Sequence, residues 1–318
     1  MTKVVITDTN LTNIANAIRS KTGSTDTIKP SEMATAITNL PVGGDNNAKI
    51  NTSNIYTGGT YGLVSLITHI DNLDITGVTN LSNFFRNCNR LTEFPTMDTS
   101  DVTDMNNLFL GCNAMTTAPL YNSSKAVQMY SMFQGCQNLV NVPLYDTSKA
   151  ESMYSMFQSC VNLVNIPAFV TSSATSMAGM FDSCYKLESV PLLDTSHVQN
   201  MSNMFRYCQT LETIPALDTS EATNMSYMFY SATNLKNVPY FNASKCTNFS
   251  GMFASVSKLT DESLDNILKM CISATSYTGT KTLYNMNFRR TSIPSARWTA
   301  CPSYQDFLDA GWTIGYSG

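Results

Sequence analysis

Residues 153–160 read MYSMFQSC and residues 129–136 read MYSMFQGC, so nearly the same eight residues recur after 24 positions. The repeat extends along the chain, because phenylalanine recurs with this period at Phe85, Phe109, Phe133, Phe157, Phe181, Phe205, Phe229 and Phe253. Six cysteines follow it too, at Cys88, Cys112, Cys136, Cys160, Cys184 and Cys208. A fixed short period is typical of a solenoid, whose stacked coils bury their apolar residues only against neighbouring coils.

The coil at residues 138–160 predicts the path of each repeat. An L-x-x-L-x-L spacing over residues 139–144 indicates a short parallel strand, with Leu144 in the core and Tyr145 on the outer face. The DTS triplet at residues 146–148 is turn chemistry. The apolar face of a short helix or of 3₁₀ turns then follows at i, i+3, i+4 and i+7, formed by Met153, Met156, Phe157 and Cys160.

A column of prolines limits the predicted strand. Proline recurs every 24 residues at Pro95, Pro119, Pro143, Pro167, Pro191, Pro215 and Pro239. Because proline has no N–H to donate to a ladder, we expect the parallel sheet to be interrupted there in every coil. The strands should therefore be short and lie mostly at residues 139–142 and their equivalents.

The regular period ends on both sides, which divides the chain into four parts. Residues 1–44 predict a small helical attachment segment, because they contain two amphipathic patterns and a Pro-Val-Gly-Gly linker. The segment is too small to hold a stable core alone, so we expect it to dock onto a partner or to self-associate. We expect an N-terminal cap at residues 45–80, the solenoid at residues 81–257 and a C-terminal cap at residues 258–318. Within that C-terminal part, TDESLDNILKM at residues 260–270 predicts a helix. A separate small binding domain at residues 258–318 is the alternative.

Composition excludes several classes of function. Hydrophobic residues make up 43% of the 318 residues and charged residues only 13%. The net charge is -4 and Lys and Arg form no run, so the chain has no electrostatic footprint for nucleic acid. No apolar stretch is long enough to span a bilayer, and the N-terminus lacks the apolar segment of a secretory signal. We expect no membrane insertion, and a protein of this kind that acts outside cells would have to be released by lysis or another non-Sec route.

Side chains suited to catalysis or metal binding are scarce. The chain has two histidines, His69 and His197, too few for a His-based triad or zinc site. Cysteines spaced by 24 lack C-x-x-C pairing, so we expect reduced, buried thiols. A recurring Asp or Asn before each turn serine offers oxygens for calcium, but turn formation also explains it. We therefore predict no enzyme activity, no cofactor and no metal site.

Two sets of positions follow from the period. The first is a structural ladder in the core, comprising Phe109, Phe133, Phe157, Phe181, Phe205, Cys112, Cys136, Cys160, Cys184 and Cys208. The second is a candidate ligand-contact face beside the prolines, with aromatic Tyr121, Tyr145 and Phe169 next to polar Thr117, Asn141 and Asn165. Aromatic rings beside amide and hydroxyl groups suit carbohydrate or protein surfaces. The alternative is that the bend at proline turns the aromatic column inward as a second core ladder.

The repeat unit P-x-x-D-T-S-x-x-x-x-M-x-x-M-F-x-x-C-x-x-L, as at residues 191–211, resembles a known family. It is similar to the BspA-like leucine-rich repeats of bacteria and to the related repeats of mycoplasma-type surface lipoproteins. The resemblance covers about residues 73–256, and AGWTI at residues 310–314 is similar to C-terminal caps in such proteins. It implies a leucine-rich-repeat-like α/β solenoid and a role in adhesion or surface recognition.

A second resemblance concerns the N-terminus. Residues 11–37, LTNIANAIRSKTGSTDTIKPSEMATAI, resemble a segment that recurs in tail and receptor-binding proteins of phages and prophages of Gram-positive bacteria. This resemblance implies phage tail or baseplate proteins as partners of residues 1–44.

The expected function is therefore non-enzymatic recognition. We expect a phage tail-associated protein whose solenoid face binds a cell-surface glycan or protein. By analogy with repetitive tail proteins, which are often trimers, the protein could also form oligomers. One alternative is a bacterial cell-surface adhesin of the leucine-rich repeat type. Another is a passive structural spacer or assembly component. A wall-degrading hydrolase would need a carboxylate pair that the repeats do not place.

Overall fold

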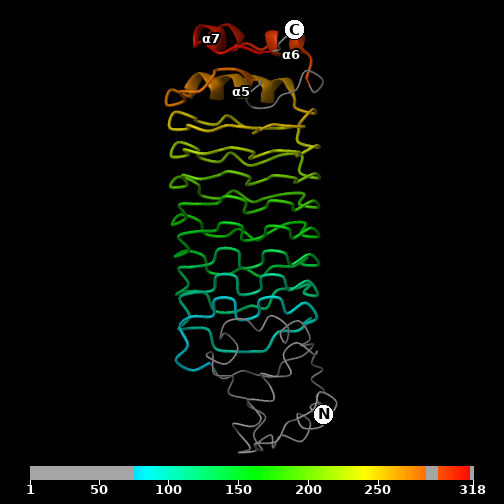
Figure 1. Cartoon of the computed structure of the whole chain (residues 1–318), viewed down its shortest axis with the longest axis vertical. Coiled ribbons are helices and arrows are strands. Elements are labelled where there is room, and N and C mark those ends of the chain that lie inside the picture. The colour runs from blue at the N-terminus through cyan, green and yellow to red at the C-terminus, as the bar shows by residue number, and fades with distance from the viewer. Residues whose placement is uncertain (1–74, 284–292, 316–318) are drawn as a thin grey trace, which may run out of the picture.

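The computed structural model describes residues 75–283 and 293–315. Figure 1 shows flat coils stacked into a column, with helices at the C-terminal end. Parallel bridges join residues 24 positions apart in consecutive coils, in the series Asn80, Asp104, Gln128, Ser152, Ser176, Asn200, Asn224 and Asn248. The chain is therefore a solenoid in which each sequence repeat forms one coil between two neighbours.

The methionine and phenylalanine segment of each coil consists of turns closed by hydrogen bonds between residues three apart, as in the predicted 3₁₀ turns, whereas the alternative of a short helix is wrong: no described residue of 81–257 belongs to a helix. Its backbone N–H groups alternate between two kinds of partner. The N–H of Phe157 donates to the carbonyl of Met180 in the next coil at 2.9 Å, whereas that of Gln158 donates to Ser155 in its own coil at 3.1 Å. An α-helix would direct each of them to the carbonyl four residues earlier. The apolar spacing identified the inward side chains, but bonding between coils takes half of the donors.

Left-handed residues explain why no helix forms there. In the coil of Phe157, Ser155 and Ser159 have φ of 52° and 62°. Equivalent positive-φ residues stand in all eight coils, at Asn83, Asn87, Asn107, Gly111, Ser131, Gly135, Ser155, Ser159, Gly179, Ser183, Asn203, Tyr207, Tyr227, Ser231, Gly251 and Ser255. A left-handed residue every four positions ends each run of right-handed backbone before a helix can continue.

The predicted short strand is reduced to isolated parallel bridges. On the side of residues 139–142, the bridges are Thr117 with Asn141 and Thr213 with Asn237. Pro143 lacks an N–H, so the ladder cannot continue through it. The regular series of bridges lies on the other side of the coil, directly before the first buried residue of the second long side, which is methionine in six of the eight coils. The expectation that pairing would concentrate before the prolines is therefore wrong.

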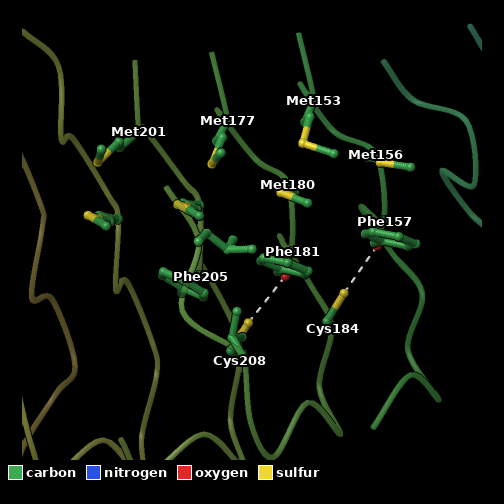
Figure 2. Close-up of a cluster of buried hydrophobic side chains, with 14 of the residues drawn as sticks. Met153, Met156, Phe157, Met177, Met180, Phe181, Cys184, Met201, Phe205 and Cys208 are labelled. Carbon is green, nitrogen blue, oxygen red and sulfur yellow. Dashed lines mark hydrogen bonds between the residues drawn. The ribbon is translucent and has the colours of Figure 1, made fainter. Parts of the chain in front are cut away.

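The core is a stack of identical side chains from successive coils. The rings of Phe133 and Phe157 lie 5.5 Å apart and nearly parallel. The thiol of Cys184 donates to the carbonyl of Phe157 in the preceding coil at 3.1 Å, and Cys208 makes the equivalent bond to Phe181 (Figure 2). All ten residues of the predicted structural ladder have 0% exposure, namely Phe109, Phe133, Phe157, Phe181, Phe205, Cys112, Cys136, Cys160, Cys184 and Cys208.

Three helices close the C-terminal end of the stack: α5 (Asp261–Ser273), α6 (Ser295–Thr299) and α7 (Tyr304–Asp309). The helix predicted at residues 260–270 is present as α5, and the hydroxyl of Thr260 caps it by accepting from the N–H of Ser263. The Ser263 hydroxyl in turn accepts from the N–H of Val238 at 2.8 Å and donates to the carbonyl of Lys236 at 2.9 Å. The helix therefore satisfies backbone groups that another coil would otherwise bond.

Both tryptophans are buried in this C-terminal part, with Trp298 at 0% and Trp312 at 1% exposure. The rings of Trp312 and Tyr277 stack at 5.5 Å. The predicted attachment segment at residues 1–44, residues 45–74 of the predicted N-terminal cap, and His69 lie outside the described residues.

Candidate binding surfaces

Each coil has two long sides whose inward residues share one core. We call the outward residues of 139–147 and their equivalents the proline face, and those of 151–161 and their equivalents the methionine face. In the coil of Phe157, Leu139 and Tyr145 point inward from the first side, and Met153 and Phe157 point inward from the second. The two faces therefore lie on opposite sides of the stack.

The predicted aromatic contact column is buried beneath the proline face. Tyr121, Tyr145 and Phe169 are exposed by only 5%, 1% and 4%. The hydroxyl of Tyr121 donates to the carbonyl of Pro95 in the preceding coil at 2.8 Å, and the hydroxyl of Tyr145 makes the equivalent bond to Pro119. The assignment of these rings as ligand contacts is therefore wrong, and the alternative of a second core ladder holds.

The prediction assigned the wrong orientation to the two residues that follow each proline. Leu144 was expected in the core but is 61% exposed, whereas Tyr145 beside it is buried. From Pro143 onward the side chains alternate in the opposite sense to the prediction, because the interrupted strand does not continue the earlier pleat. An aromatic ring buries more apolar area than leucine, and its hydroxyl also satisfies a carbonyl group of the preceding coil.

The leucines displaced from the core form an exposed line, which we call the apolar stripe. It consists of the residues directly after six of the seven prolines, Leu120, Leu144, Ala168, Leu192, Ala216 and Tyr240, all exposed. Leu120, Leu192 and Tyr240 are exposed by 70%, 68% and 47%. Val170, two residues after Ala168, adds to the stripe at 52%. A contiguous exposed apolar patch usually marks a contact site.

Polar residues border the apolar stripe on one side. Thr117, Asn141 and Asn165, predicted as the polar half of the contact face, are exposed. The amide of Asn141 lies 3.5 Å from the hydroxyl of Thr117 in the preceding coil. These three residues therefore lie at the surface beside the stripe, whereas the rings predicted beside them are buried.

Carboxylates border the stripe on its other side. The Asp146 carboxylate accepts from the Ser148 hydroxyl at 2.6 Å and from the Ser148 N–H at 3.0 Å. These hydrogen bonds, the hydroxyl first, lower the pKa of Asp146. Asp194 and Asp218 make equivalent bonds with lowered pKa values, which keeps this row ionised at neutral pH.

The methionine face has a polar ladder instead of an apolar stripe. The amide of Gln158 donates to one oxygen of Asp182 at 3.0 Å, and Nε of Arg206 donates to the other at 3.0 Å. Gln134 continues the series by donating to Gln158 at 2.5 Å. The Asp182 side chain is 4% exposed and that of Arg206 is 37% exposed, so a buried carboxylate orients a guanidinium at the surface.

Four tyrosines gather where this ladder ends, and we call them the tyrosine patch: Tyr185, Tyr207, Tyr227 and Tyr230. The ring centroids of Tyr185 and Tyr207 lie 6.4 Å apart, and those of Tyr207 and Tyr230 lie 5.4 Å apart. Tyr227 and Tyr230 are separated by 5.8 Å. The guanidinium of Arg206 lies over the Tyr207 ring at 5.1 Å. The patch thus joins residues of three consecutive coils.

Two of these tyrosines occupy strained backbone positions. Tyr207 and Tyr227 have φ of 59° and 55°, at columns where the other coils have only glycine, asparagine or serine. A bulky residue there costs of order 1 to 3 kcal/mol. The ring of Tyr227 lies over Gly251 of the next coil, where an added Cβ would come within 2.5 Å of the ring. The Tyr227 ring therefore fits in this position because glycine has no side chain.

Sequence reasoning missed the tyrosine patch, although the aligned repeats contained a signal for it. Tyr207 and Tyr227 are the exceptions in two columns of small residues. What the alignment could not show is that these columns have left-handed backbone, or that both columns lie on one face.

The charged groups near α5 bond chiefly to one another. A pocket of about 500 Å³ lies between the start of α5 and α6, lined by Asp261, Glu262, Asp265, Ala296, Arg297, Ala300, Cys301 and Pro302. The guanidinium of Arg297 donates to Asp261 at 2.6 Å and to the carbonyl of Leu259 at 2.7 Å.

Among residues 75–283 and 293–315, no group of three His, Cys, Asp or Glu side chains is arranged to hold a metal ion.

The stacked coils, their 24-residue period and the two opposite surfaces that they form define a solenoid repeat protein. The model of the family described as "Mycoplasma protein of unknown function, DUF285" matches residues 51–165, 79–191 and 175–276. The chain belongs to this family, in agreement with the resemblance to mycoplasma-type repeats. Residues 11–37, which resemble phage tail segments, lie outside the match. No curated protein matches the chain.

Solved structures similar to this chain are leucine-rich repeat proteins. One from T. pallidum has 20% identity and a TM-score of 0.40, over 64% of this chain and 85% of that chain. One from Eubacterium ventriosum has 16% identity and a TM-score of 0.35, over 61% of this chain and 44% of that chain. A leucine-rich cell surface protein from Faecalibacterium prausnitzii has 18% identity and a TM-score of 0.29, over 56% and 61%.

Among the described residues, 75–283 and 293–315, no helix has the length and apolarity needed to cross a membrane.

Proposed function

We propose that this protein is a non-enzymatic recognition protein that binds a partner on a cell surface through the proline face. The observation that supports this is the apolar stripe, in which three leucines stand 61 to 70% exposed at equivalent positions of the stack. Soluble proteins seldom expose aligned large apolar residues that no partner covers.

The stripe has no structural role that would explain it. Leu120, Leu144 and Leu192 lie outside the core, and Ala168 and Ala216 occupy the same position in two other coils. A small residue is therefore compatible with this position of the coil. Fully burying one leucine against a partner is worth roughly 1.5 to 3 kcal/mol, so three leucines would make a substantial contribution to association.

The borders of the stripe indicate how a partner would be oriented. Ionised Asp146, Asp194 and Asp218 lie on one side, and neutral Thr117, Asn141 and Asn165 on the other. A partner surface with apolar groups in its centre and cationic groups along one edge complements this arrangement. Charge complementarity of this kind sets orientation and the rate of encounter more than affinity.

The direct test is binding of the labelled full chain to intact bacterial cells. The triple variant Leu120→Ser, Leu144→Ser, Leu192→Ser should lose most cell binding with its melting temperature unchanged. Tyr154→Ser is the control, because Tyr154 is 49% exposed but lies on the methionine face. A triple variant that binds cells like the wild type would contradict the proposal.

Two related experiments separate the alternatives. A passive spacer predicts no cell binding by the wild-type chain in any condition. For a binding protein, treating the cells with protease removes a protein receptor, whereas periodate oxidation removes a glycan receptor. Loss of binding after one treatment alone identifies the class of partner.

The finer assignment to a phage tail depends on the resemblance of residues 11–37, and the adhesin alternative fits the solenoid equally well. If residues 1–44 attach the protein to a tail, their deletion should abolish its recovery with virions and leave cell binding intact. Unchanged recovery with virions would remove the phage assignment and leave the adhesin.

A further inference from the structure

The tyrosine patch is a second exceptional surface, and it lies on the face opposite the apolar stripe. Its two left-handed tyrosines are not required by the coil, because fourteen equivalent positions hold glycine, asparagine or serine with the same backbone. Backbone strain that is retained at a surface position points to a role in binding. At Tyr227 the next coil also makes room for the ring, because Gly251 has no side chain.

The patch is positively charged relative to the rest of the chain. Its three coil segments, residues 176–186, 200–210 and 224–234, contain two bases, Lys186 and Arg206, and one acid, Asp182, in a chain whose net charge is -4. Asp182 is buried and already accepts from Gln158, Ser183 and Arg206. The Arg206 side chain uses its Nε for that bond, which leaves both Nη groups to donate to a ligand. The ligand should therefore contain carboxylates or similar anions.

The size and arrangement of the rings indicate the kind of ligand. Four partly exposed tyrosines offer far less area than the roughly 800 Å² that each partner contributes to a standard protein interface. Their centroids follow one another at 6.4 Å and 5.4 Å from coil to coil, and neighbouring ring planes are inclined by 61° and 82°, so the row offers ring faces and ring edges in turn to an extended ligand. Aromatic rings bind the C–H faces of pyranoses, and tyrosine hydroxyls bond sugar hydroxyls.

We propose that the tyrosine patch binds an acidic, linear glycan, with uronic acid rings against Tyr185, Tyr207 and Tyr230 and a sugar carboxylate on the guanidinium of Arg206. This goes beyond the proposed function, because it assigns a ligand to a face that the apolar stripe does not include. Tyr227, whose ring lies on Gly251, extends the aromatic surface by one position.

The test uses the full chain and isothermal titration calorimetry with hexagalacturonate as the probe. Its methyl ester, which has the same sugars without free carboxylates, tests the charge, and poly-glutamate tests carboxylates without sugars. The wild type should bind hexagalacturonate about tenfold or more tightly than either of the other two. No binding of hexagalacturonate, or equal binding of either control compound, would overturn the proposal.

The variant Tyr207→Asn, Tyr227→Asn places a residue that tolerates left-handed backbone at both positions. It should weaken hexagalacturonate binding about tenfold or more, because two rings are removed, while the melting temperature stays the same or rises. Tyr154→Asn is the matched control, since Tyr154 is an exposed tyrosine of the same face at ordinary φ, and should leave both quantities unchanged.

Two outcomes of this comparison would contradict the proposal. If the double variant keeps its affinity, the rings are not the site; if it melts markedly lower, they are structural packing. The Leu120→Ser, Leu144→Ser, Leu192→Ser variant should still bind hexagalacturonate, so failure of the proposed cell-binding surface and failure of the glycan site are distinguishable.

Discussion

The proline face and the methionine face are built from the same 24-residue period, but they vary in different ways. On the proline face, the side chains that differ between coils, such as Leu144, point outward, and they introduce no left-handed backbone. On the methionine face, small left-handed residues fill nearly every coil, and the exceptions at Tyr207 and Tyr227 are strained. The comparison teaches that a repeat can display side chains freely on one side while its backbone restricts them on the other.

The largest effect should come from the core that both faces share. Phe157→Ala removes one ring from a stack in which the neighbouring rings lie 5.5 and 5.9 Å away. We expect the free energy of unfolding to fall by about 3 to 5 kcal/mol. Tyr154→Ala in the same coil should change it by less than about 0.5 kcal/mol. Chemical denaturation measures both, and similar losses would mean that the two sides of this segment are not separated as described.

Gly251→Ala tests the strained side of the comparison. Gly251 has φ +65°, and an added Cβ would come within 2.5 Å of the Tyr227 ring. The substitution should cost about 2 kcal/mol, part from the left-handed backbone and part from the displaced ring. In the Tyr227→Ser background the ring contribution disappears, so the cost should be smaller by about 0.5 kcal/mol or more. Equal costs in the two backgrounds would show that the ring does not depend on Gly251.

Tyr145→Phe and Leu144→Ser compare neighbouring residues on the proline side. The Tyr145 hydroxyl donates to the carbonyl of Pro119, so Tyr145→Phe leaves a buried acceptor unsatisfied and should cost about 1 kcal/mol. Leu144 is 61% exposed, so Leu144→Ser should change stability by less than about 0.5 kcal/mol. A larger loss for Leu144→Ser would place the leucine in the core, as the sequence pattern suggested.

The smallest effect concerns pH. Hydrogen bonds from Ser148 and Ser196 lower the pKa values of Asp146 and Asp194 in the folded protein. A lowered folded pKa contributes stability that is present above the unfolded value, near 3.8, and lost as the pH falls through the folded value. Ser148→Ala with Ser196→Ala should therefore lower the melting temperature slightly at pH 7, by an amount that shrinks below about pH 4. A difference independent of pH would show that the carboxylates are not involved.

The amino-acid sequence by itself determined the solenoid, because stacking identical coils requires identical buried positions at a fixed spacing. Phe157 and Cys160 could therefore be assigned to the core from their period alone. The helix α5 was predictable as well, since its apolar spacing and Thr260 cap are local signals.

Only the tertiary structure decided which residues form that surface. Leu144 and Tyr145 are both apolar enough for a core, and the choice between them depends on how the backbone leaves Pro143 and on the carbonyl of Pro119 in the preceding coil. Tyr207 and Tyr227 have left-handed backbone and donate their N–H groups to the next coil, and no local sequence pattern reveals either property. In a solenoid the inward positions repeat and are legible in the sequence, whereas the orientation of the outward ones is set by contacts between coils.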